Sequence, residues 1–272
     1  MSAAAGGDRP RRRAGRGSPG AGPAAPAALR PAAPAGGAAP RAAAPAGDAA
    51  RRERIGRLAL GAFAAATAAD LAALLAGWHP GHVLAKPLLM PLLVAYVLTR
   101  PGAPRLLVAA LLFGWGGDLA LLFDAEPAFL VGMGSFAAGH VCYLLLFARR
   151  RTGPGLGAAY AAALLGTVGL LWADLPAALR IPVACYSLLL TAMAYRSSAL
   201  GLRAGLGGAL FLLSDSLIAT GVASWPQPPR PDFWIMATYA AAQYLLADGA
   251  LAARAYRREV DPARPAGTEI PT

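Results

Sequence analysis

Charged residues are scarce in this sequence. Only 14% of its 272 residues are Asp, Glu, Lys or Arg, and 57% are hydrophobic. Soluble domains carry about 25% charged residues. So few charges could not cover the water-facing surface of a folded chain of this length. A soluble globular domain is therefore excluded, and lipid is expected to surround most of the chain.

Cysteines and the common catalytic motifs are also scarce. Cys142 and Cys185 are the only two cysteines, and they lie in apolar segments without zinc-like spacing, so neither a disulfide framework nor a metal site is expected. The sequence has no serine elbow, His-Glu zinc motif, phosphate loop or Asp-rich diphosphate motif. Serine hydrolases, metalloproteases, ATPases and prenyltransferases therefore lack the residues that they need, and no cofactor is expected.

The positive charge is distributed unevenly. The net charge of +11 comes from arginines in the N-terminal segment and in short gaps between apolar runs. This pattern is typical of membrane topology rather than of a nucleic-acid-binding surface, so no nucleic-acid partner is expected. Residues 1–54 consist mainly of Ala, Pro, Gly and Arg, and we predict that this tail is disordered. The tail is either inert or attracted to anionic lipid.

Apolar segments of about 17 to 23 residues follow from Leu58 onward, and each could cross the hydrocarbon as a helix. The sequence therefore predicts an all-α polytopic membrane protein with about eight transmembrane helices. They make up a membrane domain at 55–254, and a short polar tail follows at 255–272. The predicted spans are 58–77, 83–99, 103–122, 127–148, 155–173, 176–195, 203–222 and 232–253.

Arginine gathers in alternate gaps between these spans. The gaps in between instead carry mainly Asp, Glu, His and Trp residues. Because cytoplasmic loops collect Lys and Arg, this alternation predicts an even number of spans, with both termini in the cytoplasm of a multi-pass cell-membrane protein. The arginines on the predicted cytoplasmic side are Arg100, Arg105, Arg149, Arg150, Arg151, Arg196, Arg203, Arg254, Arg257 and Arg258.

Few ionisable residues lie inside the spans, and each is a functional candidate because such groups are costly at bilayer depth. Asp248 lies near the cytoplasmic end, where we expect it to pair with Arg254 or with solvent. Counted from the predicted outer boundary of each span, Lys86, Asp70, Asp118 and Asp215 lie at depths that differ by only about one helical turn, so they could share a cavity. His140 lies deeper. The complete set is Asp70, Lys86, Asp118, His140, Asp215 and Asp248.

Several of these residues allow two interpretations. Lys86, the only lysine, either extends to the outer interface or acts as a counter-ion to Asp118 or a ligand of lipid phosphate. Pro87 and Pro91 each free a backbone carbonyl, which protein or a wet cavity must then satisfy. Asp70 near its helix end is either structural or part of the site.

Asp118 and Asp215 are the strongest candidates. The glycines before Asp118 could serve only in packing, and Ser214 and Ser216 could hydrogen-bond to their own helix. The two carboxyl groups are harder to explain in that way. Two carboxyl groups at similar depth can share a site in which one is protonated and the other ionised, as in an acid and base pair.

Six stretches, in order along residues 58–253, resemble the YhhN-like family of membrane proteins, which includes the lysoplasmalogenases. No counterpart exists for the N-terminal tail. Each stretch alone is weak, but six in order at sensible span positions make a specific resemblance. They are KPLLMPL at 86–92, GDLALL at 117–122, FLVGMGSF at 129–136, GHVCY at 139–143, SDS at 214–216 and YAAAQ at 239–243.

The resemblance implies hydrolysis of the vinyl ether of 1-alkenyl lysophospholipids, with Asp118 and Asp215 as catalytic residues. We expect His140 to relay or orient a proton and Lys86 to hold the lipid phosphate. Tyr143, Tyr239 and Gln243 are expected to bind water or the headgroup. The alternative is a small transporter or lipid-binding protein whose intramembrane carboxyl groups carry protons or a cation. The sequence indicates no oligomeric state.

Overall fold

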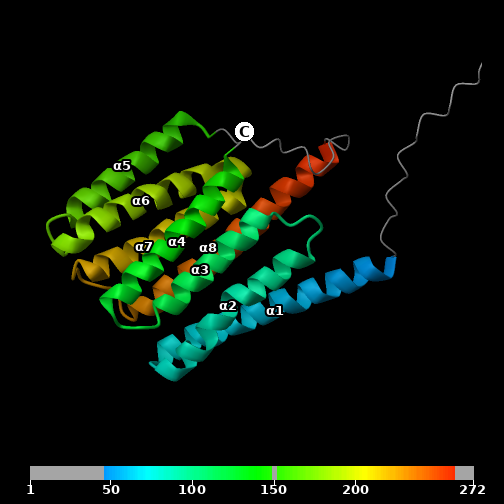
Figure 1. Ribbon diagram of the computed structural model, residues 1–272, viewed down its shortest axis with the longest axis horizontal. Helices are drawn as coiled ribbons and strands as arrows, with labels where there is room; N and C mark the ends of the chain where they lie inside the picture. Colours follow the sequence, from blue (N-terminus) through cyan, green and yellow to red (C-terminus); the bar gives the residue numbers. More distant parts are fainter. Residues whose placement is uncertain (1–45, 149–151, 261–272) are drawn as a thin grey trace, which may run out of the picture. The chain divides into compact units, whose positions relative to one another are not determined.

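The computed structural model describes residues 46–148 and 152–260, and in this part of the chain it contains helices and turns but no strand. The predicted all-α fold is confirmed. Figure 1 shows the eight α-helices, which run alternately up and down. They are α1 (Ala46–Ala76), α2 (His79–Thr99), α3 (Arg105–Ala120), α4 (Glu126–Phe147), α5 (Pro154–Leu171), α6 (Ala177–Ser197), α7 (Leu202–Val222) and α8 (Pro231–Val260), with a short 3₁₀ turn at Ser198–Leu200.

The eight helices lie at the eight predicted span positions. In the described residues, α1, α2, α4, α5, α6 and α7 are long and apolar enough to cross a membrane. Helix α3 has only 16 residues, and α8 is more polar, with basic residues in its last turn. The multi-pass membrane character is therefore confirmed, whereas eight crossings and cytoplasmic termini stay predictions.

Two helices extend beyond their predicted ends. We predicted disorder for residues 1–54, but α1 already begins at Ala46. Its first turns are rich in Ala and Arg, which favour helix. Arg57 also lies 4.0 Å from Glu53, one turn before it. Helix α8 continues to Val260, into the predicted C-terminal tail. The remaining parts of both tails, residues 1–45 and 261–272, lie outside the described residues.

Helix α8 packs against four other helices, α7, α1, α2 and α3. Helix α2 packs between α1 and α3, and α4 packs against both α3 and α6. Helix α5 lies at an edge and packs mainly against α6 (Figure 1). Polar residues on the inner face of α8 are therefore shielded by its neighbours, whereas α5 is the least enclosed helix.

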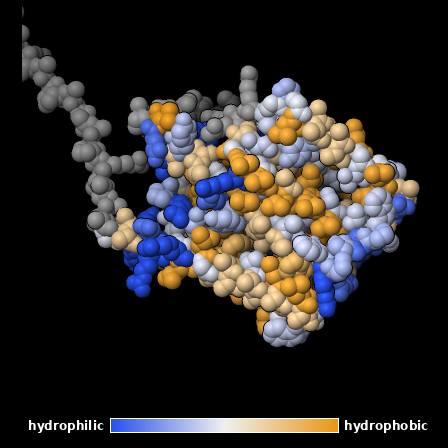
Figure 2. All heavy atoms as spheres, turned by 180° about the vertical axis from the view of Figure 1, so that it is seen from behind, coloured by the Kyte–Doolittle hydropathy of each residue, from blue (hydrophilic) through white to orange (hydrophobic). Residues whose placement is uncertain are grey.

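Apolar side chains occupy both the interior and the surface. Leu89, Leu93 and Leu111 are fully buried, whereas Leu84 and Leu165 are largely exposed. Figure 2 shows hydrophobic residues over much of one face, with the most hydrophilic residues mainly toward its edges. Because these helices are apolar on all sides, their outward faces suit lipid rather than water.

The prolines inside α2 illustrate how the fold satisfies its backbone. Pro91 has no N–H to donate to the carbonyl of Pro87, four residues earlier. The indole Nε1–H of Trp115 on α3 donates to that oxygen at 2.9 Å. For this carbonyl, the prediction that another part of the protein satisfies it is confirmed. The same bond joins α3 to α2 beside Lys86.

Candidate active site

Asp118 lies at the end of a chain of hydrogen bonds. It is near the end of α3, is only 2% exposed, and its Oδ2 accepts a bond from the Tyr239 hydroxyl of α8 at 2.8 Å. Gln243, one turn further along α8, donates its Nε2–H to the Tyr239 oxygen at 3.2 Å. Its Oε1 accepts from the Tyr143 hydroxyl of α4 at 2.8 Å. Every donor in the chain therefore points toward the carboxyl group.

Asp215 has a second chain of its own. The hydroxyl of Tyr186 on α6 donates to Oδ2 of Asp215 on α7. His140 Nε2 on α4 lies 3.1 Å from the same hydroxyl oxygen. Because the Tyr186 proton is given to Asp215, His140 must donate its Nε2–H to Tyr186. His140 Nδ1 is buried and has no hydrogen-bond partner in the described part of the chain.

Aromatic rings lie between the hydrogen-bond chain of Asp118 and that of Asp215. The Phe211 ring lies edge-on to His140, 4.8 Å between centroids, and edge-on to Tyr239 at 5.4 Å. Phe136 packs against Tyr239 at 5.8 Å. The hydrogen-bond chains of Asp118 and Asp215 therefore meet at the Phe211 ring. The fold thus brings together both predicted aspartates with His140, Tyr143, Tyr239 and Gln243.

Glycines before Asp118 make room for these side chains. A Cβ atom on Gly114 would lie 2.8 Å from Gln243 Nε2, and one on Gly117 would lie 2.5 Å from the Phe136 ring. Both distances are shorter than real Cβ contacts, so a larger residue would displace Gln243 or Phe136. The glycines therefore serve in packing, and what they pack against is the site itself.

The serines beside Asp215 have different partners. Ser216 donates to the carbonyl of Leu212 at 2.7 Å, so it bonds to its own helix. Ser214 instead donates to the carbonyl of Ile235 on α8 at 3.1 Å. Ser214 therefore fixes α7 to α8 on the turn that carries Asp215.

Asp70 and Lys86 lie on the other side of Asp118. Asp70 is fully buried, and its Oδ1 lies 2.7 Å from His82 Nδ1. Lys86 is 7% exposed and forms no hydrogen bond or ion pair within the described residues. Charges on both residues act on Asp118. This burial argues against the interpretation in which Lys86 extends to the outer interface, because such a lysine would be more exposed, and it leaves the counter-ion and phosphate-ligand interpretations.

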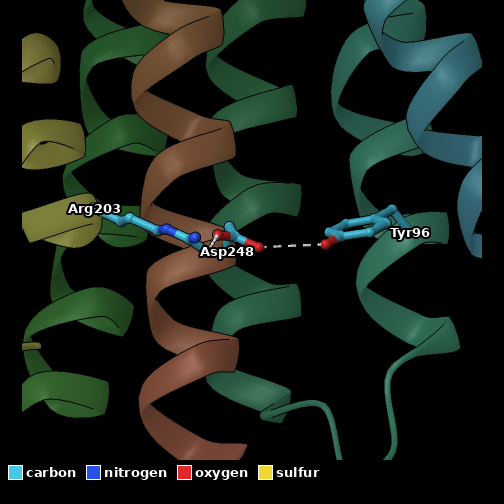
Figure 3. A network of polar contacts seen from close by, with 3 residues as sticks. All are labelled: Tyr96, Arg203 and Asp248. Carbon is cyan, nitrogen blue, oxygen red and sulfur yellow. Dashed lines mark hydrogen bonds and ion pairs between the residues drawn. The ribbon is translucent and has the colours of Figure 1, made fainter. Parts of the chain in front are cut away.

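Asp248 lies apart from these groups, and its predicted pairing with Arg254 is wrong. Its Oδ2 is 2.7 Å from Arg203 Nη1, at the start of α7. Its Oδ1 is 3.5 Å from the Tyr96 hydroxyl of α2 (Figure 3). Arg254 is six residues further along α8, and residues so spaced do not face each other on a helix. The packing of α7 against α8 brings Arg203 alongside instead.

An apolar pocket reaches Asp215. It lies between α4, α5, α6 and α7 and opens at the surface, and its 920 Å³ of empty space includes the open solvent at its mouth. Tyr186 and Asp215 are part of its wall, but Asp118 is not. Such a pocket suits a hydrocarbon chain with a reactive group beside the carboxyl group. Its apolar lining comes mainly from Phe129, Met133, Phe136, Leu164, Val168, Leu171, Leu175, Val183, Leu190, Leu212, Ile218 and Val222.

Tyr186 is the site residue that sequence reasoning missed, because it lies outside the six stretches that resemble the family. One signal could have revealed it. It stands about ten residues inside the predicted span 176–195, and a tyrosine hydroxyl at that depth needs a hydrogen-bond partner within the protein. Its depth is similar to that of Asp215.

The assembled groups are suited to proton transfer. Carboxyl, hydroxyl and imidazole groups all exchange protons, and the hydrogen-bonded chains hold them in fixed orientations. Within the described residues, no group of three or more His, Cys, Asp or Glu side chains is placed to hold a metal ion.

Known proteins share this region of the chain. The family model described as YhhN family matches residues 81–250, a range that includes Asp118, Asp215 and the residues of both hydrogen-bond chains but not Asp70. Lysoplasmalogenase TMEM86B of Homo sapiens is 35% identical over 175 residues, covering 64% of this chain and 76% of that protein. The Sus scrofa protein of the same name is 35% identical over 62% and 75% of the two chains. Lysoplasmalogenase TMEM86A of Bos taurus is 31% identical over 59% and 71%. No solved structure gives a significant match.

Proposed function

The chain belongs to the YhhN family, and we propose that it is a lysoplasmalogenase of the cell membrane. It hydrolyses the vinyl ether of 1-alkenyl lysophospholipids to a fatty aldehyde and a glycerophospho-base. The names of its relatives support this activity. The observation that carries the proposal is the carboxyl group of Asp215 in the wall of an otherwise largely apolar pocket.

The pocket accepts the alkenyl chain. Its lining along α7 runs from Leu212 to Val222, a distance of about 15 Å at 1.5 Å per residue. The vinyl ether lies beside Asp215, where the chain meets the glycerol. Lys86 is a buried cation that forms no hydrogen bond or ion pair within the described residues. Its ammonium group is therefore free to receive the phosphate of the substrate.

The reaction needs one acid and one base. Protonation of the terminal alkene carbon, the one not bonded to oxygen, gives an oxocarbenium ion. Water adds to the carbon next to the ether oxygen and loses a proton to the base. The resulting hemiacetal collapses to the aldehyde and the glycerol hydroxyl. One water molecule is consumed, and neither a metal ion nor a nucleotide is required.

Asp215 supplies the proton, because it is the carboxyl group that meets the pocket. Tyr186 bonds only its Oδ2, which leaves Oδ1 to carry the proton toward the alkene. Asp118 provides negative charge near the cation and accepts the proton of water. This division resembles that of glycosidases, in which two carboxyl groups handle an oxocarbenium-like transition state.

The other polar residues of the site orient the two catalytic carboxyl groups. His140 orients the Tyr186 hydroxyl that donates to Asp215. Tyr143, Gln243 and Tyr239 fix the orientation of the Asp118 carboxyl group. Each of these residues acts through the hydrogen bonds described above.

Aldehyde release by the purified protein tests the proposal. The wild type should release a fatty aldehyde from 1-alkenyl lysophosphatidylethanolamine in detergent, and chelators should not inhibit it. Asp118→Asn and Asp215→Asn should each lower the rate about a hundredfold or more, because general acid and base groups contribute roughly 10² to 10⁴. Asn nearly preserves the shape of Asp, so the variants should fold.

Asp248→Asn is the matched control. It removes the charge of another aspartate inside a predicted span, away from the apolar pocket beside Asp215. The rate of this variant should stay within about twofold of the wild-type rate. A proton-coupled transporter would also fail without Asp118 or Asp215, but it would release no aldehyde in detergent. Wild-type protein that transports a solute and yields no aldehyde would refute the enzyme proposal.

A further inference from the structure

A second pocket lies at the arginine-rich end of the helices, between the end of α2 and the last turns of α8. It is open to solvent, and its 1020 Å³ of empty space includes the solvent at its mouth. Arg254 in its wall is fifteen residues beyond Tyr239 on α8, about 22 Å away at 1.5 Å per residue. Its lining is Tyr96, Arg100, Pro101, Gly102, Asp248, Leu251, Ala252, Arg254, Ala255, Arg258 and Glu259.

Two arginines in this wall carry hydrogen-bond donors without acceptors. The Nε atoms of Arg100 and Arg254 are buried, and neither has a hydrogen-bond partner in the described part of the chain. A buried N–H without an acceptor is unfavourable, more so when the group is charged. The Arg100 guanidinium lies over the Tyr96 ring at 4.7 Å from its centroid, which holds it in place. Two cationic side chains, of which Arg100 is held by Tyr96, therefore border the pocket with N–H groups that lack an acceptor.

The acidic residues of the pocket do not accept hydrogen bonds from the Nε–H groups of Arg100 and Arg254. Asp248 is engaged by Arg203 at 2.7 Å, and Figure 3 shows it between Arg203 and Tyr96. Glu259 is exposed and forms no ion pair within the described residues. Arg258 adds a third cation, which donates to the carbonyl of Pro101 at 2.9 Å. Positive charge therefore exceeds negative charge in the pocket wall.

We propose that this pocket binds a phosphate group, most favourably the phosphate monoester headgroup of an anionic membrane lipid. Guanidinium groups match phosphate oxygens in geometry and charge, and one phosphate can accept from several arginines at once. Basic pockets between transmembrane helices on the cytoplasmic side suit anionic headgroups. Leu251, Ala252 and Ala255 give the same pocket an apolar wall for the glycerol and the start of the acyl chains.

The bound phosphate is not that of the substrate under reaction. In a lysophospholipid, the phosphate is separated from the vinyl ether by the glycerol alone, whereas this pocket begins at Asp248, about 14 Å along α8 from Tyr239, and Arg254 lies about 22 Å from Tyr239. The proposal therefore stands independently of the proposed activity, and binding can be measured without any turnover.

Titration of the purified full-length protein with a short-chain lipid tests the site. Dioctanoyl phosphatidic acid should bind and raise Tm, as any ligand of the native state does. Arg254→Gln should weaken this binding at least about tenfold, because it removes a charge-assisted donor. Within the described residues Arg254 makes no hydrogen bond or ion pair that the change would break, and helicity by circular dichroism checks the fold. Arg105→Gln, an exposed arginine at the same end but outside the pocket, should bind like the wild type.

Further ligands and a second variant separate the sources of the phosphate. Arg100→Lys keeps the charge but loses the planar fork, and it should weaken binding severalfold. Inorganic phosphate that binds as tightly as the lipid would identify a free phosphate site. Dioctanoyl phosphatidylcholine that binds equally well would show that the tails rather than the anionic charge dominate, and it would overturn the proposal. Absence of any phosphate binding, or unchanged affinity in Arg254→Gln and Arg100→Lys, would overturn it too.

Discussion

Replacing Tyr186 with Phe removes one oxygen atom from the centre of the candidate site. In the native protein this hydroxyl donates to Asp215 and accepts from His140 at 3.1 Å. The change leaves an oxygen of Asp215 without its donor and His140 Nε2–H without its acceptor. Hydrogen bonds to charged groups contribute about 1.5 to 3 kcal/mol. Since about 1.4 kcal/mol corresponds to a tenfold change in rate, kcat should fall roughly ten- to hundredfold.

The Michaelis constant should respond differently. The ring of Tyr186 is part of the pocket wall, and Phe keeps that ring, so KM for the alkenyl lysolipid should change less than about threefold. Initial rates of aldehyde release over a range of substrate concentrations would separate the two constants.

Tyr195→Phe is the matched control for this experiment. Tyr195 lies on the same helix, and its hydroxyl donates to the carbonyl of Thr152 at 3.1 Å, outside the site. Its loss should leave kcat within about twofold of the wild type. Wild-type kcat in Tyr186→Phe, or an equal loss of kcat in both variants, would refute the role assigned to Tyr186.

Three other predictions address the pocket, the packing and the topology. Ala219→Phe should fill part of the apolar pocket and raise KM for a long alkenyl chain roughly tenfold, with less effect on a short chain in the same kinetic assay. Trp115→Phe should leave the Pro87 carbonyl without its donor and destabilise the fold by about 1 to 3 kcal/mol, seen as a lower Tm in detergent. Reporter fusions after Arg203 should be cytoplasmic and one after Asp124 external, and the reverse pattern would contradict the predicted topology.

The helix positions could be predicted because their signal is local. Each apolar run must match the thickness of the hydrocarbon, and arginine in alternate gaps separates neighbouring runs. Asp118 and Asp215 also stand out in the sequence, because ionisable residues inside such runs are rare. Both kinds of signal can be read without knowing which helix packs beside which.

Pairings between helices could not be predicted in that way. Whether Asp248 meets Arg254 on its own helix or Arg203 on α7 depends on how α8 is rotated against its neighbour. Tyr186 became part of the site only because α6 packs against both α4 and α7. Helix α8 looks like one span among others in the sequence, yet four helices pack against it. These facts depend on distances between elements, which one sequence does not contain.

The weak attachment of α5 has a consequence for how a lipid reaches and leaves the pocket. Leu171 is the one buried residue of this helix, although Ala163, Leu164, Thr167 and Val168 also border the pocket. No side-chain hydrogen bond joins Pro154–Leu171 to another helix in the described part of the chain. Within a bilayer, apolar contacts between helices can be exchanged for contacts with acyl chains at little net free energy. Displacing α5 would therefore open the pocket sideways to the lipid, so that a fatty aldehyde could diffuse into the membrane without crossing water.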